Sequence, residues 1–152
     1  MASLDDVYKK FGETAEAAQL LETEISNILL SIKAVEYDFF QNQNKSMAHG
    51  ILEKINKSTL GTLLKKVEEI IGGEENLIKI FQNALNERNR LSHSFYREHN
   101  FRRNSNKGCD IMLEDLEKMH KTILQAYKVA LALSGIDLDK LDLPIPTKHL
   151  QL

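Results

Sequence analysis

The sequence has little of what disulfide-rich, cysteine-ligated and membrane-spanning proteins are built from. Its 152 residues include one cysteine, Cys109, two prolines and no tryptophan. A single cysteine cannot form a disulfide within the chain, and it excludes a cysteine-rich metal cluster. No window approaches the roughly 18 uninterrupted apolar residues of a membrane-spanning helix. Residues 1–10 also lack the basic start and apolar run of a signal peptide, so we expect no membrane association and a reducing, cytoplasmic location.

Length and charge narrow the architecture. A chain of this length with 42% apolar residues is close to the commonest size of a single domain and can bury one core. The formal net charge of -2 argues against a surface that is basic all over, as in proteins that coat nucleic acid, but it allows a local basic patch. We expect one domain over residues 1–143 and an extended tail over 144–152, which holds Pro144 and Pro146.

Apolar residues recur three and four apart through most of the chain, which is the spacing of amphipathic helices. Ser3, with Asp6 three residues on, is a capping pattern, so a leading helix either precedes the first long one or merges with it. Ser58 or Thr59 can cap a helix that Gly72 and Gly73 end, and Asp110 is the expected cap of the last helix. We found no period-two alternation typical of strands, so the sequence predicts an all-α, antiparallel bundle of about five helices. The helical segments are expected at about 14–40, 47–55, 60–71, 77–95 and 110–134. The first of them has one apolar stripe, which runs from Leu21 to Phe39 and includes Val35.

One arginine stands where the helical pattern calls for an apolar residue. Positions 77, 81, 84, 88, 91 and 95 keep helical spacing and hold Leu, Phe, Ala, Arg, Leu and Phe. Burying an unpaired guanidinium is costly, so Arg88 requires a partner or a water-filled cleft. An interpretation that needs no function pairs it with an acid of the first long helix. The candidates are Glu22, Glu36 and Asp38.

The neighbours of Arg88 have the chemistry for cleaving RNA without a metal. Asn89 and His93 are four residues apart and share a helix face, whereas Arg88 and His93 diverge by about 140° on an ideal helix. A helix end or a second subunit would help the two converge. Arginine binds phosphate through paired hydrogen bonds, and histidine exchanges protons near neutral pH. RNA carries its own nucleophile, the 2′-hydroxyl, so a proton carrier and a cation are sufficient.

Residues 88–93, with the sequence RNRLSH, resemble the signature of the HEPN superfamily (higher eukaryotes and prokaryotes nucleotide-binding), in which an arginine, a polar residue, a short spacer and a histidine follow one another. Residues 59–64 and 85–95 also resemble its bacterial members. The resemblance implies a helical homodimer with two motifs across a shared cleft. In many toxin and defence members it implies a metal-independent endoribonuclease. By that implication Arg88 stabilises the phosphate, Asn89 positions the group and His93 transfers the proton.

The chain departs from the superfamily at one regulatory position. In toxins that a partner nucleotidyltransferase silences, the modified tyrosine lies two residues past the histidine. This chain has Phe95 there and Tyr96 one position further on. Whether Tyr96 is modified, and which antitoxin protein would be the partner, is left open by the sequence.

Basic residues gather after the motif. Between Asn86 and Lys107 only Glu87 and Glu98 carry negative charge, and we expect the basic side chains of this stretch to contact RNA phosphates. The alternative is a solvated basic loop. The predicted RNA-binding residues are Arg90, Arg97, Arg102, Arg103 and Lys107.

Two functions therefore compete at this stage. The first is a metal-independent HEPN-type endoribonuclease, as a toxin or a defence effector, with RNA as its substrate and no cofactor. The second is a non-catalytic HEPN module that binds a nucleotide, RNA or a protein partner. No metal site is predicted, because His49, His99, His120 and His149 show no mutual spacing suited to a metal ion.

Overall fold

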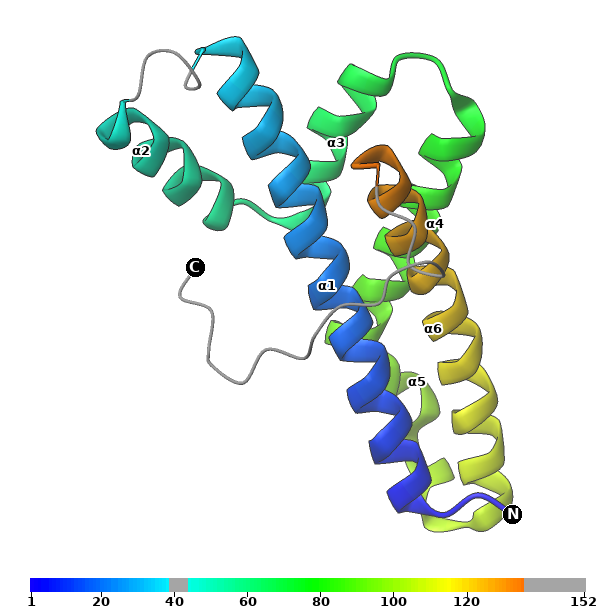
Figure 1. Ribbon diagram of the computed structural model, residues 1–152. Coiled ribbons are helices and arrows are strands. Elements are labelled where there is room, and N and C mark those ends of the chain that lie inside the picture. Colours follow the sequence, from blue (N-terminus) through cyan, green and yellow to red (C-terminus); the bar gives the residue numbers. More distant parts are fainter. Residues whose placement is uncertain (39–43, 136–152) are drawn as a thin grey trace.

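In the computed structural model, which describes residues 1–38 and 44–135, helices account for nearly the whole described chain (Figure 1). The described residues include no strand, so the prediction of an all-α bundle is confirmed. None of the described helices is long and apolar enough to cross a membrane. The predicted tail at 144–152 lies outside the described residues. The elements are α1 (Leu4–Glu36), α2 (Lys45–Asn56), α3 (Leu60–Ile71), α4 (Glu75–His93), α5 (Phe95–His99), the 3-10 helix η1 (Asn100–Asn104) and α6 (Asn106–Leu133).

The first helix begins at Leu4, ten residues before the predicted start near residue 14. Ser3 Oγ accepts a hydrogen bond from the Asp6 N–H at 3.2 Å, and the Asp6 carboxylate accepts one from the Ser3 N–H at 2.8 Å. This capping box starts α1 at Leu4, so the leading segment merges with the long helix. The helix ends at Glu36, short of the predicted end near residue 40, and Asp38 follows with a positive φ of 53°.

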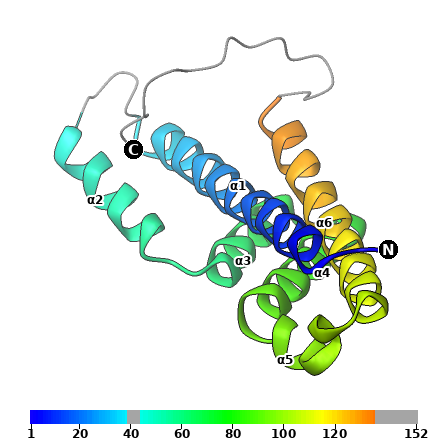
Figure 2. The ribbon, with the colours of Figure 1, turned by 90° about the horizontal axis from the view of Figure 1, so that it is seen from below.

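Consecutive long helices alternate in direction, but α1 and α6, which make the most extensive helix contact, run parallel. Contacts between them advance together along both helices. Ala2 N–H donates to Asp110 at 2.6 Å, Lys10 Nζ lies 2.9 Å from His120 Nδ1, and Ser134 Oγ donates to Glu24 at 2.6 Å. Figures 1 and 2 show the start of α1 beside the start of α6. The short α5 and η1 reverse the chain between α4 and α6 and make this arrangement possible.

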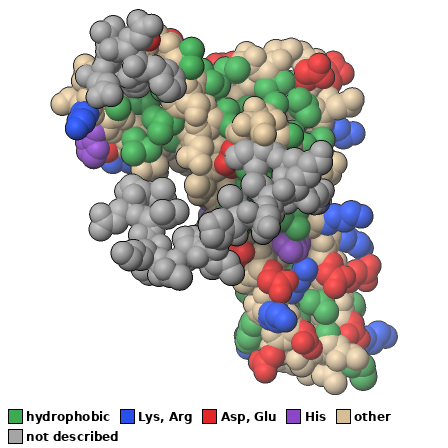
Figure 3. All heavy atoms as spheres, viewed as in Figure 1, with side chains coloured by type: hydrophobic (Ala, Val, Ile, Leu, Met, Phe, Trp, Pro, Cys, Tyr) green, Lys and Arg blue, Asp and Glu red, His purple; other side chains and the backbone are tan. Residues whose placement is uncertain are grey.

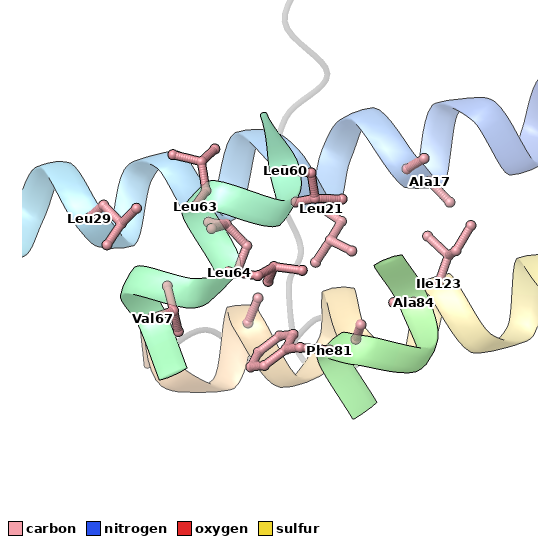
Figure 4. Close-up of a cluster of buried hydrophobic side chains, with 14 of the residues drawn as sticks. Ala17, Leu21, Leu29, Leu60, Leu63, Leu64, Val67, Phe81, Ala84 and Ile123 are labelled. Carbon is pink, nitrogen blue, oxygen red and sulfur yellow. The ribbon is translucent and has the colours of Figure 1, made fainter. Parts of the chain in front are cut away.

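The core consists of two buried clusters that follow one another along the bundle. The upper cluster joins α1, α3, α4 and α6 around Phe81 and Leu64 (Figure 4). The lower cluster joins the start of α1 to Leu91, Phe95 and α6. Arg88 therefore occupies the turn of α4 between the residues that enter the two clusters. An arginine can therefore occupy this position of the apolar pattern, because the side chain lies between the two clusters and not inside either of them.

Helix ends were predicted with mixed success. Thr59 caps α3 and Gly72, with a φ of 51°, ends it, as expected from the sequence. The predicted cap of the last helix was wrong. Ser105 Oγ accepts from the Gly108 N–H at 3.0 Å, so α6 starts at Asn106. Asp110 lies inside α6, and its carboxylate accepts the Ala2 N–H.

The far half of α1 carries apolar side chains that the bundle does not fully cover. Figure 3 shows charged side chains over the lower half of the molecule and apolar ones gathered towards its upper part. A hollow of about 450 Å³ opens there between α1, α2 and α3, with Ile32, Ile51 and Ile70 among its lining residues. Val35, predicted to belong to the buried stripe, is 71% exposed. The stripe of α1 is therefore buried only as far as Leu29.

Candidate functional site

The predicted phosphate-binding arginine has a partner from another helix. Arg88 is half-buried on α4, and its Nε and Nη2 both lie 2.9 Å from Oε1 of Glu22 on α1. Its Nη1 donates to Asn89 Oδ1 at 3.3 Å. Among the described residues these contacts engage three of the five N–H groups of the guanidinium, and two have no partner there. Glu22 also lines a hollow of about 420 Å³ between α1, α2 and α3, so the pair lies next to a concave surface.

Asn89 and His93 lie on an exposed face of the same helix. His93 is the last residue of α4, and both side chains are exposed. Within the described part of the chain no hydrogen bond reaches the His93 ring, and none joins it to Arg88 or Asn89. One chain thus brings the side chains of Arg88 and Asn89 together. His93 points away from Arg88, as the divergence of about 140° on an ideal helix predicts.

Helical hydrogen bonding continues past His93 through a bend at Ser94. The Ser94 N–H donates to the Arg90 carbonyl and the Glu98 N–H donates to the Ser94 carbonyl, both at 2.9 Å, although Ser94 has a φ of -137°. Arg97 Nη2 then donates to the His93 carbonyl at 2.9 Å. Arg97, a predicted RNA-binding residue, therefore lies directly beside the predicted proton carrier.

Arg90 is surrounded by carboxylates. Its guanidinium contacts Glu87 at 2.9 Å, Glu98 at 2.7 Å and Asp115 at 2.8 Å. Hydrogen bonds from Arg90 and from Ser94 Oγ hold the pKa of Glu98 below its ordinary value. Burial would raise the pKa of Asp115, but hydrogen bonds from Arg90 and His99 outweigh it and lower the pKa. Arg90 is thus already compensated by three acids of its own chain.

The sequence interpretation missed the residues that complete this network. His99 is only 5% exposed, and its Nε2 lies 2.7 Å from Asp115 Oδ2. Arg102 Nη1 lies 2.8 Å from His99 Nδ1. Because a guanidinium only donates, Nδ1 must accept, which places the ring proton on Nε2, facing Asp115. Asp115 lies on α6, so no local spacing in the sequence relates it to Arg90. The one part of the network that the sequence could have indicated is the contact of Ser94 with Glu98, because these residues are four apart and share a helix face.

The two remaining basic residues, Arg103 and Lys107, lie in η1 and in the first turn of α6. Arg103 Nη2 donates to the hydroxyl of Tyr8 on α1 at 2.7 Å. Lys107 is exposed in the first turn of α6 and makes no ion pair with a described residue. Arg97, Arg103 and Lys107 therefore keep charge available at the surface, whereas Arg102 is engaged with His99 and Arg90 with acids.

Other kinds of site are not apparent in the described residues. They contain no group of three or more histidine, cysteine or carboxylate residues placed to hold a metal ion. Tyr96 lies against Tyr8, with ring centroids 6.5 Å apart, and burial raises its pKa. Comparisons with known protein families, with curated proteins and with solved structures found no match to this chain.

Proposed function

We propose that this protein is a metal-independent endoribonuclease of the HEPN type, in which Arg88, Asn89 and His93 act on a phosphodiester of RNA. The observation that supports it best is the Arg88 guanidinium, held by Glu22 and Asn89 beside a concave surface with two N–H groups left over. Those two groups suit the charge that develops on a phosphate during cleavage. The exposed His93 ring supplies a group that can carry a proton.

The reaction needs no group beyond the substrate and these side chains. The RNA 2′-oxygen attacks the adjacent phosphorus as its proton leaves, and the bond from phosphorus to the 5′-oxygen breaks as that oxygen gains a proton. The products are a 2′,3′-cyclic phosphate and a 5′-hydroxyl. His93 serves as the proton carrier and Arg88 stabilises the charge on the phosphate. Asn89 orients the guanidinium through its side-chain oxygen.

A second copy of the chain would complete the site. Arg88 and His93 do not meet within one chain, so we propose a homodimer in which the motifs of two chains border one cleft. Light scattering should then report about twice the chain mass of 17.4 kDa. A strict monomer at tens of micromolar would remove the shared cleft. A toxin or defence role in the cytoplasm, with an antitoxin partner, belongs to the same proposal.

The competing function is a non-catalytic module that binds a nucleotide, RNA or a protein. The Arg88–Glu22 pair favours it. Glu22 already compensates the charge of the partly buried arginine, so the presence of Arg88 at this position can be explained without any substrate. Under this alternative the exposed His93 ring has no chemical role, and its substitution would leave every activity unchanged.

Cleavage assays on folded variants separate the two functions. Wild-type protein should cut RNA with a chelator present and leave a 2′,3′-cyclic phosphate end. His93→Ala should lose about a hundredfold or more, the usual scale for a general acid or base. His49→Ala, which removes an exposed histidine of α2, is the matched control and should retain full activity. RNA left intact by wild type, or full activity in folded His93→Ala, would favour the non-catalytic module.

A further inference from the structure

Two half-exposed tyrosines lie beside the proposed site and have no role in it so far. Tyr8 of α1 is 43% exposed and Tyr96 of α5 is 38% exposed. Their rings contact each other edge to face, and the Tyr96 ring also packs on Phe11, with ring centroids 5.1 Å apart. Phe95, which is buried, also lies 5.1 Å from Tyr96 between ring centroids. The Tyr96 ring is therefore packed against two phenylalanines, while part of each tyrosine faces solvent.

Each of the two rings has an arginine close to it, in space for Tyr8 and in sequence for Tyr96. Arg103 donates one N–H to the Tyr8 hydroxyl, and four others remain. Arg97, the residue after Tyr96, donates one N–H to the His93 carbonyl. The acids nearest in sequence are Asp5 and Asp6 for Tyr8 and Glu98 for Tyr96. The Asp6 carboxylate is already bound to Ser3, and Glu98 is bound to Arg90. Exposed aromatic rings with guanidinium groups close by can bind unpaired nucleotides, because the rings stack on bases and the cations hold phosphates.

We infer that Tyr8 and Tyr96 form a stacking platform for the unpaired bases of single-stranded RNA, with Arg97 and Arg103 holding the flanking phosphates. The platform continues directly from His93 through Arg97, so a strand bound there would pass the proposed proton carrier. The inference rests on the proposed function, because it identifies the substrate as unpaired RNA. Bases paired in a duplex are stacked on one another and cannot reach the rings.

Binding of RNA that cannot be cleaved tests the platform separately from catalysis. The probe is a single-stranded 2′-O-methyl oligoribonucleotide, in which the attacking hydroxyl is blocked, and a second oligomer of equal length carries abasic positions. Both present the same phosphates, and only the first presents bases. The chain has no tryptophan and four tyrosines, so quenching of tyrosine fluorescence reports stacking directly, and anisotropy of a labelled oligomer gives the affinity.

Tyr96→Leu keeps an apolar side chain in the cluster and removes the aromatic face. It should weaken binding of the base-bearing oligomer about fivefold or more and leave binding of the abasic oligomer unchanged. Tyr96→Phe should bind as wild type. Tyr8→Leu, at the less packed ring, should act like Tyr96→Leu. Tyr37→Leu is the matched control, because Tyr37 is also 43% exposed and lies at the other end of α1, and it should change neither affinity.

The inference is overturned if wild-type protein binds the two oligomers equally, or if folded Tyr8→Leu and Tyr96→Leu both bind the base-bearing one as wild type does. Wild type that binds neither oligomer also overturns it and points to a protein partner. The proposed ribonuclease fails by a different result, which is full cleavage by folded His93→Ala. That result would not affect the stacking platform, since its test measures binding of an oligomer whose blocked 2′-hydroxyl prevents cleavage.

Discussion

Arg88 of α4 and Glu22 of α1 meet at the boundary between the two core clusters, with two guanidinium nitrogens each 2.9 Å from one carboxylate oxygen. Their side chains are 27% and 32% exposed, so the pair is partly solvated and an anion from solution can compete with Glu22 for Arg88. A phosphate that approaches the remaining N–H groups of Arg88 would share the guanidinium with Glu22 or displace it. The pair therefore both stabilises the helix packing and limits how strongly Arg88 can bind an anion.

Removing the charge of Glu22 should strengthen RNA binding. Glu22→Gln keeps the size of the side chain and frees Arg88 from its anionic partner, so we expect tighter binding of non-cleavable RNA and a salt dependence steeper by about one charge. The free energy of unfolding should fall by about 1 kcal/mol. Glu16→Gln, an exposed change on the same helix, is the control. RNA affinity that is the same in both variants would show that Arg88 does not contact the phosphate.

Arg90 should contribute to stability and little to RNA binding. Arg90→Gln removes the cation that compensates Glu98 and Asp115, so we expect a loss of about 1–2 kcal/mol in denaturant unfolding, with the salt dependence of RNA binding unchanged. Arg97→Gln should instead reduce the salt dependence of RNA binding and leave stability unchanged. Arg97 is exposed, and its one hydrogen bond to a described residue goes to the His93 carbonyl. A stable Arg90→Gln protein with weakened RNA binding would instead support the sequence-based prediction for Arg90.

The close approach of η1 to α6 depends on Gly108. A Cβ atom there would overlap the backbone of Arg102, which cannot move without displacing η1. Gly108→Ala should therefore lower the free energy of unfolding by about 2–3 kcal/mol. Gly12→Ala is the matched control, because open space surrounds that helical position, and it should gain about 0.5–1 kcal/mol. A thermal melt of Gly108→Ala that matches wild type would contradict the contact.

His120 should make the protein less stable as the pH falls below neutrality. Burial and the nearby Lys10 lower its pKa from the ordinary 6.5, despite opposing effects of Glu13 and Glu16. The unfolded chain then takes up the proton first. The contribution is present above pH 6.5 and is lost as the pH falls towards the lowered folded pKa, by up to about 1.4 kcal/mol per pH unit.

Unfolding curves between pH 7.5 and 5.5 measure this effect. His120→Gln should reduce the loss of stability over that range, and His49→Gln, at an exposed position, should leave it as in wild type. The geometry explains the sign, because the Lys10 ammonium only donates, so His120 Nδ1 must accept and cannot carry a proton while they are in contact. An unchanged slope in His120→Gln would exclude this histidine as the cause.

The sequence predicted those features that depend on residues within one turn of each other. The caps at Ser3 and Thr59 and the end of α3 at Gly72 are all made by neighbours in the chain, and all three are confirmed. The helical stripes were also predicted, because burial on one face repeats every three or four residues. Asp110 was misread as a cap because its role is a contact with Ala2, which lies 108 residues away in the sequence.

In the candidate site, too, local features could be predicted from the sequence and long-range contacts could not. The misfit of Arg88 is visible in the pattern of α4, and its partner could be narrowed to three acids of the first helix. The choice of Glu22 among them depends on where α4 crosses α1, which no local pattern encodes. The acids around Arg90 were missed for the same reason, since Asp115 reaches it from α6. Counting basic residues along the sequence therefore overestimated how many of them are available at the surface, since Arg90 and Arg102 are engaged by other side chains.

The parallel pairing of α1 with α6 also fixes the order in which the chain can fold. α1 is synthesised first, yet much of its buried face packs on a helix more than 100 residues later. Until α6 leaves the ribosome, Val7 and Leu21 lack part of their cover, and the loop that must close is nearly the whole domain. A nascent chain stalled before Asn106 should therefore remain sensitive to protease and bind chaperones, and should become resistant only when the last helix emerges.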